Sequence, residues 1–354
     1  RMGSGPVPAP CPVGGRRLSG VHGWLILDKP CGLGSTQAVA AVKRVLREAG
    51  YGPRSKDMPK VGHGGTLDPL AEGVLPIALG EATKLAGRML DASKIYAFTI
   101  AFGEETDTLD TEGEVVARSD RRPPLAAVQA ILAHFTGAIE QVPPSYSALK
   151  VNGKRAYDRA RAGENVDLQP RQVTIHSLDL AHDRAAMPVD SAFATTTGRS
   201  DPYDPSPPLE LADSVTLIAH VSKGTYIRSL ARDIARALGT VGHVTYLRRT
   251  KAGPFAEATA ISLDLLNEIG KGARLEDHLL PLEAGLDGIP AHPLDPESAQ
   301  AARQGRVVSG HALPDGLFLG TAGGIPVALM ESDGVAAKVV RGFNLPDTAK
   351  KDET

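Results

Sequence analysis

The segment that most constrains the fold covers residues 62–84 and reads GHGGTLDPLAEGVLPIALGEATK. Its glycines at positions 62, 64 and 65 allow positive φ angles and a close approach of the backbone to another group. Asp68 follows and is locked by the proline after it, so a constrained loop presents its carboxylate. By itself, a G-x-x-D-P motif is more often a turn with a capping aspartate. The segment also lacks the Gly-Lys-Ser/Thr ending of a phosphate-binding loop.

The apolar pattern around this segment predicts mixed α and β structure. Short runs of apolar residues predict buried strands, and apolar residues at three- and four-residue spacing predict helices. The expected strands cover residues 24–30, 95–102 (buried on both faces) and 215–221 (half-buried), and the expected helices cover residues 35–50, 125–136 and 227–238. In the first helix, Ser35 or Thr36 is the expected N-cap and Gly50 the expected C-terminal stop.

The length of 354 residues exceeds what one core usually supports, so two domains are expected. The expected parts are a disordered leader (1–22), a large domain (23–283), a small β-barrel (284–346) and a tail (347–354). The proline-rich stretch 183–213 cannot bury enough apolar surface to offset its ordering entropy, so it is expected to be a flexible insertion. No apolar run approaches the ~20 residues of a membrane span.

Charge is distributed unevenly along the chain. The net charge of -2 argues against a wholly basic nucleic-acid binder, but phosphate contacts need only a local basic face. Residues 223–251 contain seven basic residues and one acidic residue, and the segment 150–161 adds further basic residues. Arginines at four-residue spacing usually mark a solvated helix face. A stretch of one sign that spans a strand, a helix and the segment after them favours nucleic-acid binding.

The sequence predicts neither a metal site nor a cofactor. Two cysteines, Cys11 and Cys31, form no CxxC pair or disulfide framework, which indicates a reducing cytoplasm. No HExxH motif or cluster of Cys and His is present. Residues 107–113 (DTLDTEG) lack the alternating acids of a calcium loop and are expected to form a turn between strands. A glycosidase would need a second carboxylate, and spacing alone assigns none to Asp68.

Six blocks of sequence together resemble the pseudouridine synthase family that modifies uridine 55 of tRNA. The pattern G-H-x-G-x-L-D-P followed by L-P-x-x-L-G-E-A-T-K is highly specific, and the other blocks follow in the family's order. The blocks are LILDKPCGLGST (25–36), residues 62–84, SKIYAFTIAFGEETDTLDTEG (93–113), VPPSYSALKVNGKRAYDRARAG (142–163), SKGTYIRSLARDIARALG (222–239) and GHVTYLRRTKAGPF (242–255).

This resemblance implies an α+β fold, with a mixed, largely antiparallel sheet flanked by helices and a basic cleft across it. The C-terminal region resembles a PUA-like β-barrel that binds RNA. The implied substrate is the T-arm stem-loop of tRNA, and the reaction breaks the C1′–N1 bond, turns the uracil and rejoins it through C5. It needs no cofactor or metal. The resemblance further implies a cytoplasmic enzyme, expected to be a monomer, with no obligate protein partner and no membrane association.

The resemblance also assigns roles to three catalytic residues. Asp68 matches the family's catalytic aspartate, which could attack C1′, attack C6 or remove a 2′ proton. Tyr96 matches the tyrosine that packs on the uracil, although on its own it would be read as a strand-core aromatic. Arg228 matches the arginine that pairs with the catalytic carboxylate, and a forked hydrogen bond is expected between the two.

Five further residues are expected to bind substrate. Tyr226 and Leu247 match walls of the base pocket, and His63 matches a residue that helps to hold the flipped T loop. Lys29 and Lys84 match positions that support the active-site loop or contact RNA. For an unlabelled leucine such as Leu247, plain core is the commoner role.

Two other functions remain open at this stage. An RNA-guided pseudouridylase shares the core but works within a protein–RNA complex, and the absence of a long basic C-terminal tail counts against it. A non-catalytic RNA-binding or tRNA-folding protein could also keep the fold. The joint presence of Asp68, Tyr96 and Arg228 argues against this alternative, because binding alone does not need the carboxylate.

Overall fold

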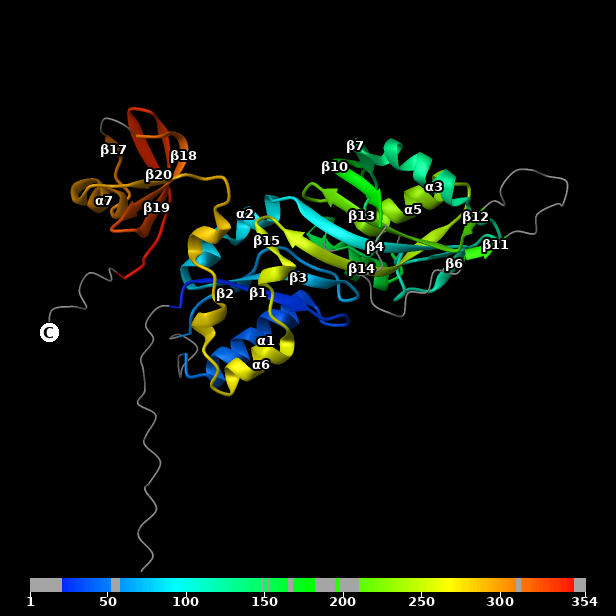
Figure 1. Ribbon diagram of the computed structural model, residues 1–354, viewed down its shortest axis with the longest axis horizontal. Coiled ribbons are helices and arrows are strands. Elements are labelled where there is room, and N and C mark those ends of the chain that lie inside the picture. Colours follow the sequence, from blue (N-terminus) through cyan, green and yellow to red (C-terminus); the bar gives the residue numbers. More distant parts are fainter. Residues whose placement is uncertain are drawn as a thin grey trace, which may run out of the picture.

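The computed structural model has one large sheet and a smaller C-terminal sheet joined by an extended segment (Figure 1). It describes residues 21–51, 58–147, 149–151, 153–164, 168–181, 195–197, 210–309 and 313–346. The predictions for the leader before residue 21, for most of the 183–213 insertion and for the tail from residue 347 lie outside these ranges. The leader boundary was placed slightly late, because Val21 is 8% exposed and His22 Nδ1 accepts a hydrogen bond from the amide of Glu81.

The large sheet has nine strands in the order β1-β3-β14-β4-β13-β10-β7, with β2 paired to β3 and β15 to β14. All pairings are antiparallel except that of β14 with β3, so the prediction of a mixed, largely antiparallel sheet is confirmed. The strands are β1 Gly23–Lys29, β2 Val61–His63, β3 Glu72–Leu79, β4 Lys94–Phe102, β7 Gly137–Gln141, β10 Arg171–Leu180, β13 Ser214–Val221, β14 Gly242–Ala252 and β15 Phe255–Ala256.

The parallel contact between β3 and β14 is a short seam that joins two parts of the large sheet. Only two residue pairs form it, Arg248 with Glu72 and Arg249 with Gly73. Gly73 has a φ of +98°, and a Cβ there would lie 2.3 Å from the carbonyl oxygen of Arg249. A residue without a side chain is therefore required where the two strands approach this closely.

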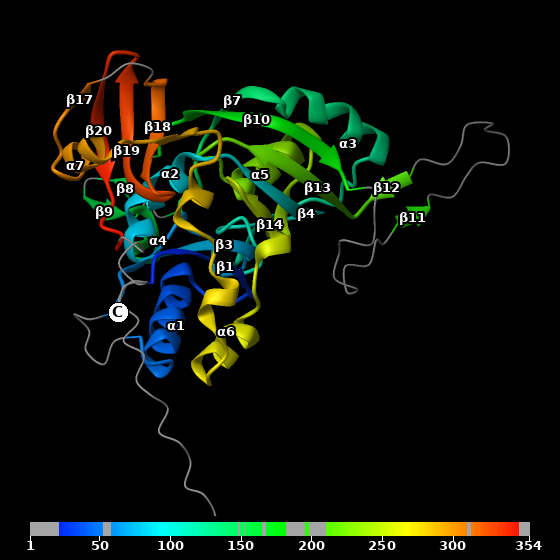
Figure 2. The same cartoon turned by 60° about the vertical axis from the view of Figure 1, so that its left-hand side comes forward.

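Helices cover one face of the large sheet. Helices α1 (Ser35–Glu48) and α6 (Leu263–Gly270) lie side by side next to β1 (Figure 2). Helix α5 (Ile227–Ala237) packs on the central strands β14 and β4, and α3 (Leu125–Ile131) lies nearer the other end of the sheet. Along β1, Leu25 and Leu27 pack into this core, whereas Trp24 and Ile26 pack into a second cluster. Burial on both faces accounts for the unbroken apolar run that predicted this strand.

The predicted start of α1 was wrong by one residue. Gly34 is the N-cap, and Ser35 is the first helical residue, 4% exposed. The Ser35 hydroxyl instead binds the main chain of Leu67. The helix ends at Glu48, and Gly50 follows with a φ of +83°, as expected of a glycine past a helix end.

Shorter elements connect the strands. The 107–113 turn joins β5 (Glu104–Thr106) to β6 (Val115–Arg118), as predicted. Part of the predicted insertion is packed rather than flexible, because Ala212 is 5% exposed and its amide donates to the Pro123 carbonyl oxygen. The remaining elements are η1 Gly80–Leu85, α2 Ala86–Asp91, η2 Leu132–Phe135, β8 Lys150–Val151, β9 Lys154–Arg155, α4 Ala156–Arg161, β11 Thr195–Thr197, β12 Glu210–Ala212, η4 Glu257–Thr259, η5 Leu275–His278 and η6 Leu282–Gly285.

The C-terminal region is a five-stranded, curled sheet in the order β16-β18-β19-β20-β17, packed against α7 (Pro296–Arg303). Phe318 and Met330 lie in a core of its own. Leu319, Leu329 and Phe343 instead pack into the cluster that contains Trp24, so the two sheets are docked together. The strands are β16 Ala291–Pro293, β17 Val308–Ser309, β18 Asp315–Ala322, β19 Ile325–Asp333 and β20 Ala336–Gly342.

Candidate active site

Asp68 lies on the loop between β2 and β3, as the glycine pattern predicted. The glycines have packing roles here. Gly65 has a φ of +124°, and a Cβ on Gly64 would lie 2.8 Å from the Cβ of Met89 in α2. Glycine is needed at position 64 because the loop runs this close to α2, and at position 65 because of its positive φ angle.

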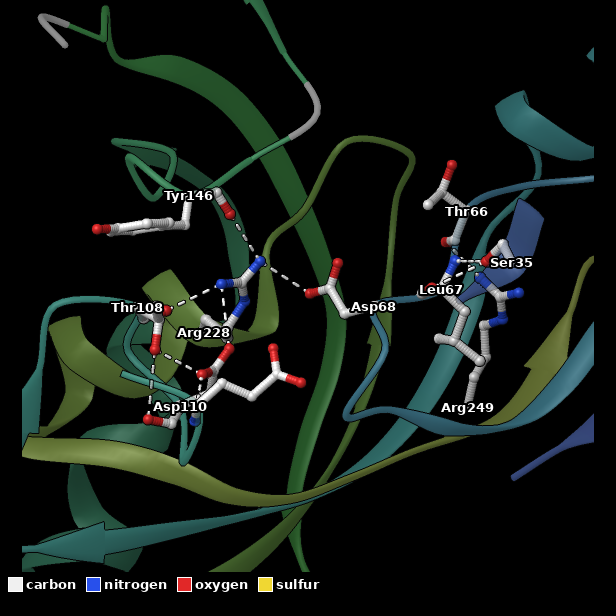
Figure 3. Close-up of polar contacts among 10 residues, drawn as sticks. Ser35, Thr66, Leu67, Asp68, Thr108, Asp110, Tyr146, Arg228 and Arg249 are labelled. Atoms are coloured by element: carbon white, nitrogen blue, oxygen red, sulfur yellow. Dashed lines mark hydrogen bonds and ion pairs between the residues drawn. The ribbon is translucent and has the colours of Figure 1, made fainter. Parts of the chain in front are cut away.

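Every carbonyl oxygen from residue 65 to residue 69 accepts a hydrogen bond. Arg249 donates to those of Gly65 and Thr66, at 3.4 and 3.2 Å. The Ser35 hydroxyl donates to the Leu67 oxygen and accepts from the Leu67 amide, both at 2.8 Å (Figure 3).

The two remaining carbonyls complete this set. The amide of Ala71 donates to the Asp68 oxygen at 3.1 Å. The Pro69 oxygen receives the amide of Gly32 at 2.8 Å and the ammonium of Lys29 at 3.1 Å. The main chain that carries Asp68 is therefore fixed before any substrate arrives, as a preorganised site requires.

Arg228, at the start of α5, pairs with Asp68. Its Nη2 lies 2.9 Å from Asp68 Oδ2, and its Nη1 lies 3.2 Å from Asp110 Oδ2 (Figure 3). The same two nitrogens donate to the carbonyl oxygens of Thr108 and Tyr146, at 2.9 and 3.0 Å. The pairing of Asp68 with Arg228 matches the expectation, but the forked bond does not form, because the guanidinium is shared between two carboxylates.

Asp110 was not among the predicted site residues, because the pattern of residues 107–113 predicted only a turn. Its side chain is buried, and Oδ1 accepts from Thr108 Oγ1 at 2.5 Å and from the amide of Glu112 at 3.0 Å. Leu109, just before it, has a φ of +63°. Among the described residues, it is the only one other than glycine with a positive φ. This strained turn presents both the Thr108 carbonyl and the Asp110 carboxylate to Arg228.

A cavity of about 560 Å³ beside Asp68 is here named the tyrosine pocket. It is lined by five of the predicted residues: Asp68, Tyr96, Tyr226, Arg228 and Leu247. Tyr96 on β4 lies directly opposite Arg249 on β14, and Leu247 lies opposite Phe98. Residues 95–97 of β4 are only half-buried, in contrast to the prediction of a strand buried on both faces.

The main chain of Tyr226 is held by a glutamine that the sequence analysis did not identify. Gln141, 1% exposed, accepts from the Tyr226 amide at 2.8 Å and donates to its carbonyl oxygen at 3.1 Å. The Arg171 guanidinium lies 4.7 Å from the centre of the Tyr226 ring. Both contacts fix the position of an aromatic wall beside Asp68.

A second cavity, of about 970 Å³, lies on the other side of Asp68 and is here named the acidic pocket. Its lining includes Arg161, Arg228 and five carboxylates, those of Asp68, Asp107, Asp110, Glu112 and Glu114. Burial raises the pKa of Glu112, and the charges of Asp110 and Asp68 act in the same direction. The carboxylates on this side therefore repel one another.

His63, a predicted substrate contact, lines the acidic pocket. Its Nδ1 is buried and has no hydrogen-bond partner within the described part of the chain. Burial lowers the pKa of the imidazole, and the charge of Arg249 lowers it further. The ring is therefore neutral at neutral pH.

Lys29 and Lys84, the other predicted substrate contacts, line neither pocket. Lys29 is fully buried, and its ammonium donates to the carbonyl oxygens of Pro30, Leu33 and Pro69, at 2.9, 2.7 and 3.1 Å. Burial lowers its pKa to about 8. Lys29 is therefore placed to support the Asp68 loop, and its ammonium has no hydrogen left to donate to RNA.

The ammonium of Lys84 lies 2.6 Å from Glu81 Oε2 and donates to the carbonyl oxygen of Gly342 at 2.8 Å. Glu81 Oε2 also accepts from the amide of Asn344 at 2.7 Å. Lys84 therefore ties the C-terminal sheet to the large domain, and the predicted RNA contact has no support from its position.

The basic stretch 223–251 is largely neutralised within the protein. Lys223 pairs with Asp91, Arg232 with Asp233 and Arg236 with Glu105, while Arg228 and Arg249 are buried. Arg248 contacts three carboxylates, those of Asp28, Glu72 and Glu257. The count of basic residues therefore overestimated the charge that this stretch offers to nucleic acid.

Among the described residues, no three His, Cys, Asp or Glu side chains are grouped so that they could hold a metal ion. Within the same ranges, no helix is both long and apolar enough to cross a membrane.

Comparison with known proteins places the fold. A solved Cbf5-Nop10-Gar1 complex contains a chain with 26% identity and a TM-score of 0.61, which covers 91% of this chain and 85% of that chain. The structure of an H/ACA RNP bound to a substrate RNA containing 2′-deoxyuridine has 23% identity, the same TM-score and the same coverage, and supports the fold alone. The large sheet with its Asp68 loop is thus the pseudouridine synthase fold.

Sequence comparison identifies the family. Residues 54–199 match the TruB family pseudouridylate synthase N-terminal domain, and residues 228–287 match the tRNA pseudouridylate synthase B C-terminal domain. The tRNA pseudouridine synthase B of Novosphingobium aromaticivorans is 63% identical over 330 residues, which cover 93% of this chain and all of that protein. The protein of the same name from Zymomonas mobilis is 54% identical over 92% of this chain and 96% of its own length. The chain belongs to the TruB family of pseudouridylate synthases.

Proposed function

We propose that this protein isomerises one uridine of tRNA to pseudouridine, at position 55 in the T loop, with Asp68 as the reacting carboxylate. The observation that carries the proposal is the position of Asp68, held by Arg228 beside a cavity lined by Tyr96 and Tyr226. The relatives named tRNA pseudouridine synthase B, 46% to 63% identical, support the choice of tRNA.

The geometry suits the steps of this reaction. The target base must leave its stack, which costs a few kcal/mol, and the tyrosine pocket offers aromatic and apolar walls to receive it. Asp68 at the edge of that pocket can reach the ribose or the base in each of its three possible roles. Because no atoms are gained or lost in the isomerisation, the residues of this chain can complete it without a redox cofactor.

The C-terminal curled sheet is proposed to be a PUA-like RNA-binding domain that adds affinity. Neither the tyrosine pocket nor the acidic pocket has a lining residue from 284–346, so its contribution is expected in KM for full-length tRNA rather than in kcat. We further propose that the protein acts as a monomer in the cytoplasm, where its tRNA substrate is found, without a guide RNA or an obligate protein partner.

The test is carbodiimide mapping of pseudouridine in an unmodified tRNA transcript after incubation with the purified protein. We expect one modified position, in the T loop, and none with Asp68→Asn at equal protein and RNA-binding levels. Modification that requires an added guide RNA, or product formed by Asp68→Asn, would overturn the proposal.

A further inference from the structure

We propose that Lys94 and Arg249 stabilise the negative charge that develops on the uracil when the C1′–N1 bond breaks. This inference rests on the proposed function and assigns an electrostatic role to two buried cations in the wall of the tyrosine pocket. Neither cation was among the residues predicted from the sequence.

Arg249 is 1% exposed, and all of its hydrogen bonds go to main-chain carbonyls. Nε donates to Val74 at 2.8 Å, and the terminal nitrogens donate to Thr66 and Gly65. No carboxylate among the described residues forms an ion pair with it. Arg228, the other buried arginine of the same cavity, pairs with two carboxylates. The positive charge of Arg249 is therefore not compensated locally.

Lys94 has the same kind of environment. It is 8% exposed, and its ammonium donates to the carbonyl oxygens of Met89, Leu90 and Ala92, at 2.9, 2.8 and 2.6 Å. Burial lowers its pKa to about 8, and the next largest cause is the charge of Arg249. The positive charges of Lys94 and Arg249 therefore lie close enough to affect each other.

The strand register places both cations beside the expected base. Lys94 and Tyr96 are two residues apart on β4, so their side chains project to the same face of the sheet. Arg249 lies directly opposite Tyr96 on β14. A uracil packed on Tyr96 would therefore lie next to both positive charges, within the cavity that also contains Asp68.

The chemistry needs positive charge at this place. When the C1′–N1 bond breaks, its electron pair moves to N1 and spreads over the carbonyl oxygens of the uracil. In two of the three possible roles of Asp68 the uracil leaves as a free anion, because C1′ either bonds to an Asp68 oxygen or forms a double bond to C2′ as Asp68 takes the 2′ proton. C5 of that anion then bonds to C1′ as the C1′–Asp68 bond breaks, or as the C1′–C2′ double bond takes its proton back from Asp68. The C5 proton is then lost to solvent, and N1 takes up a proton. Fixed positive charge in a desolvated pocket stabilises such an anion far more than it would in water.

A buried cation bound to carbonyls can be purely structural, as Lys29 is, but Lys29 lines neither pocket, whereas Lys94 and Arg249 both line the tyrosine pocket. Neutral donors such as glutamine can bind main-chain carbonyls, whereas burying a cation without a carboxylate partner costs folding free energy. Retaining two such cations around one cavity is expected where their charge contributes to the reaction.

The experiment compares single-turnover rates on T-arm stem-loops that carry uridine or 5-fluorouridine at the target position. Fluorine withdraws electrons, which makes the departing base a more stable anion that needs less help from the protein. For Lys94→Gln we expect the uridine rate to fall about a hundredfold and the 5-fluorouridine rate to fall much less. Because 5-fluorouridine has no C5 proton to lose after rejoining, the rate compared on the two RNAs is that of cleavage, measured as loss of the target nucleoside by chromatography after nuclease digestion.

Charge-conserving variants distinguish the effect of the positive charge from that of the hydrogen-bond geometry. Arg249→Lys loses the planar donor set but keeps the charge, so it should retain much more of the uridine rate than Arg249→Gln. Arg122→Gln is the matched control, since Arg122 also binds a main-chain carbonyl but lines neither pocket around Asp68. It should leave both rates close to those of the original protein.

Equal losses on the two RNAs in Lys94→Gln would overturn the electrostatic role and leave a structural one. If that variant does not fold, as judged by its thermal transition, the Arg249→Lys and Arg249→Gln pair decides, and equal activity of these two would overturn the inference. An original protein with no activity on uridine RNA would instead overturn the proposed function.

Discussion

The tyrosine pocket and the acidic pocket meet at Asp68, yet their walls carry opposite charge. The tyrosine pocket has four cationic side chains and one carboxylate, whereas the acidic pocket has two cationic side chains and five carboxylates. Asp68 and Arg228 belong to both walls. Charge in this site is thus separated across the Asp68–Arg228 pair, which favours an anionic base on one side and repels phosphates from the other.

The largest effect on activity is expected from substitutions of Asp68 and Arg228, which line both pockets. Asp68→Asn should abolish isomerisation, because an amide can neither attack carbon nor take a proton, while tRNA should still bind. Arg228→Lys should lower kcat by about a hundredfold or more, because one ammonium cannot contact two carboxylates and two carbonyls together. The double variant, measured in single-turnover assays with tRNA binding as the control, should be no worse than Asp68→Asn. Additive losses would show that the two residues act in separate steps.

A smaller effect is expected from the carboxylate on the acidic side of Arg228. Asp110→Asn removes one partner of a buried guanidinium and should cost about 3 kcal/mol of unfolding free energy. It should also lower kcat more than it raises KM, because Arg228 loses the contact that fixes it beside Asp68. Urea denaturation and steady-state kinetics measure the two effects. Asp107→Asn, which changes a carboxylate of the same wall with no bond to Arg228, should have a much smaller effect on both.

The role of positive charge in the tyrosine pocket can be tested by varying the pH. Lys94 loses its proton as the pH rises through about 8, so the tyrosine pocket then loses positive charge and kcat should fall. Asp91, Lys223 and Arg249 also act on this ammonium and are expected to keep their charge in that range. In Lys94→Arg the fall should move to higher pH. An unchanged pH profile of kcat in that variant would show that another group is responsible.

The same lysine links pH to stability. Its pKa is lower in the folded protein than the ordinary value of 10.5. Between about pH 8 and 10.5 the unfolded chain therefore binds more protons, and the contribution of Lys94 to stability rises with pH. Activity and this contribution to stability should change in opposite directions over the range, which denaturation at several pH values can show.

The smallest effect is expected at Glu112. Because the pKa of Glu112 is raised in the folded protein, ionising this group costs folding free energy, and the cost appears as the pH rises above its ordinary value of 4.5. Glu112→Gln should raise the urea midpoint slightly at pH 7, and the gain should vanish in acid, where the original side chain is protonated. A gain that persists in acid would have a cause other than charge.

The sequence predicted the parts of this fold that depend on local pattern. Strand β1 is buried on both faces, so its sequence is an unbroken apolar run that predicted a strand. The helical period of the apolar residues in α5 predicted a helix with Arg228 on its first turn. The glycines around Asp68 predicted a constrained loop, which the structure has. The assignment of roles to Asp68, Tyr96 and Arg228 came from the family pattern as a whole and stays a prediction.

The features that the sequence did not predict depend on contacts with residues distant along the chain. Ser35 reads as a helix N-cap, but its hydroxyl binds Leu67, 32 residues away. Asp110 reads as a turn residue because nothing local shows that Arg228 lies beside it. The basic stretch appeared free because the carboxylates that neutralise it come from other elements, such as Asp28 with Arg248.

The seam between β3 and β14 has a mechanical consequence. Lys29 and Asp68 belong to the part of the sheet that contains β1 to β3, whereas Arg228 and Tyr96 belong to the part that contains β4 and β13. Two residue pairs and the side chain of Arg249, which reaches from β14 to Val74, connect these parts within the sheet. The reacting groups therefore lie on opposite sides of a narrow joint. A small rotation about that joint would change the distance between the Asp68 carboxylate and a base packed on Tyr96, and the shared apolar core and the Asp68–Arg228 ion pair, which span the joint, resist it.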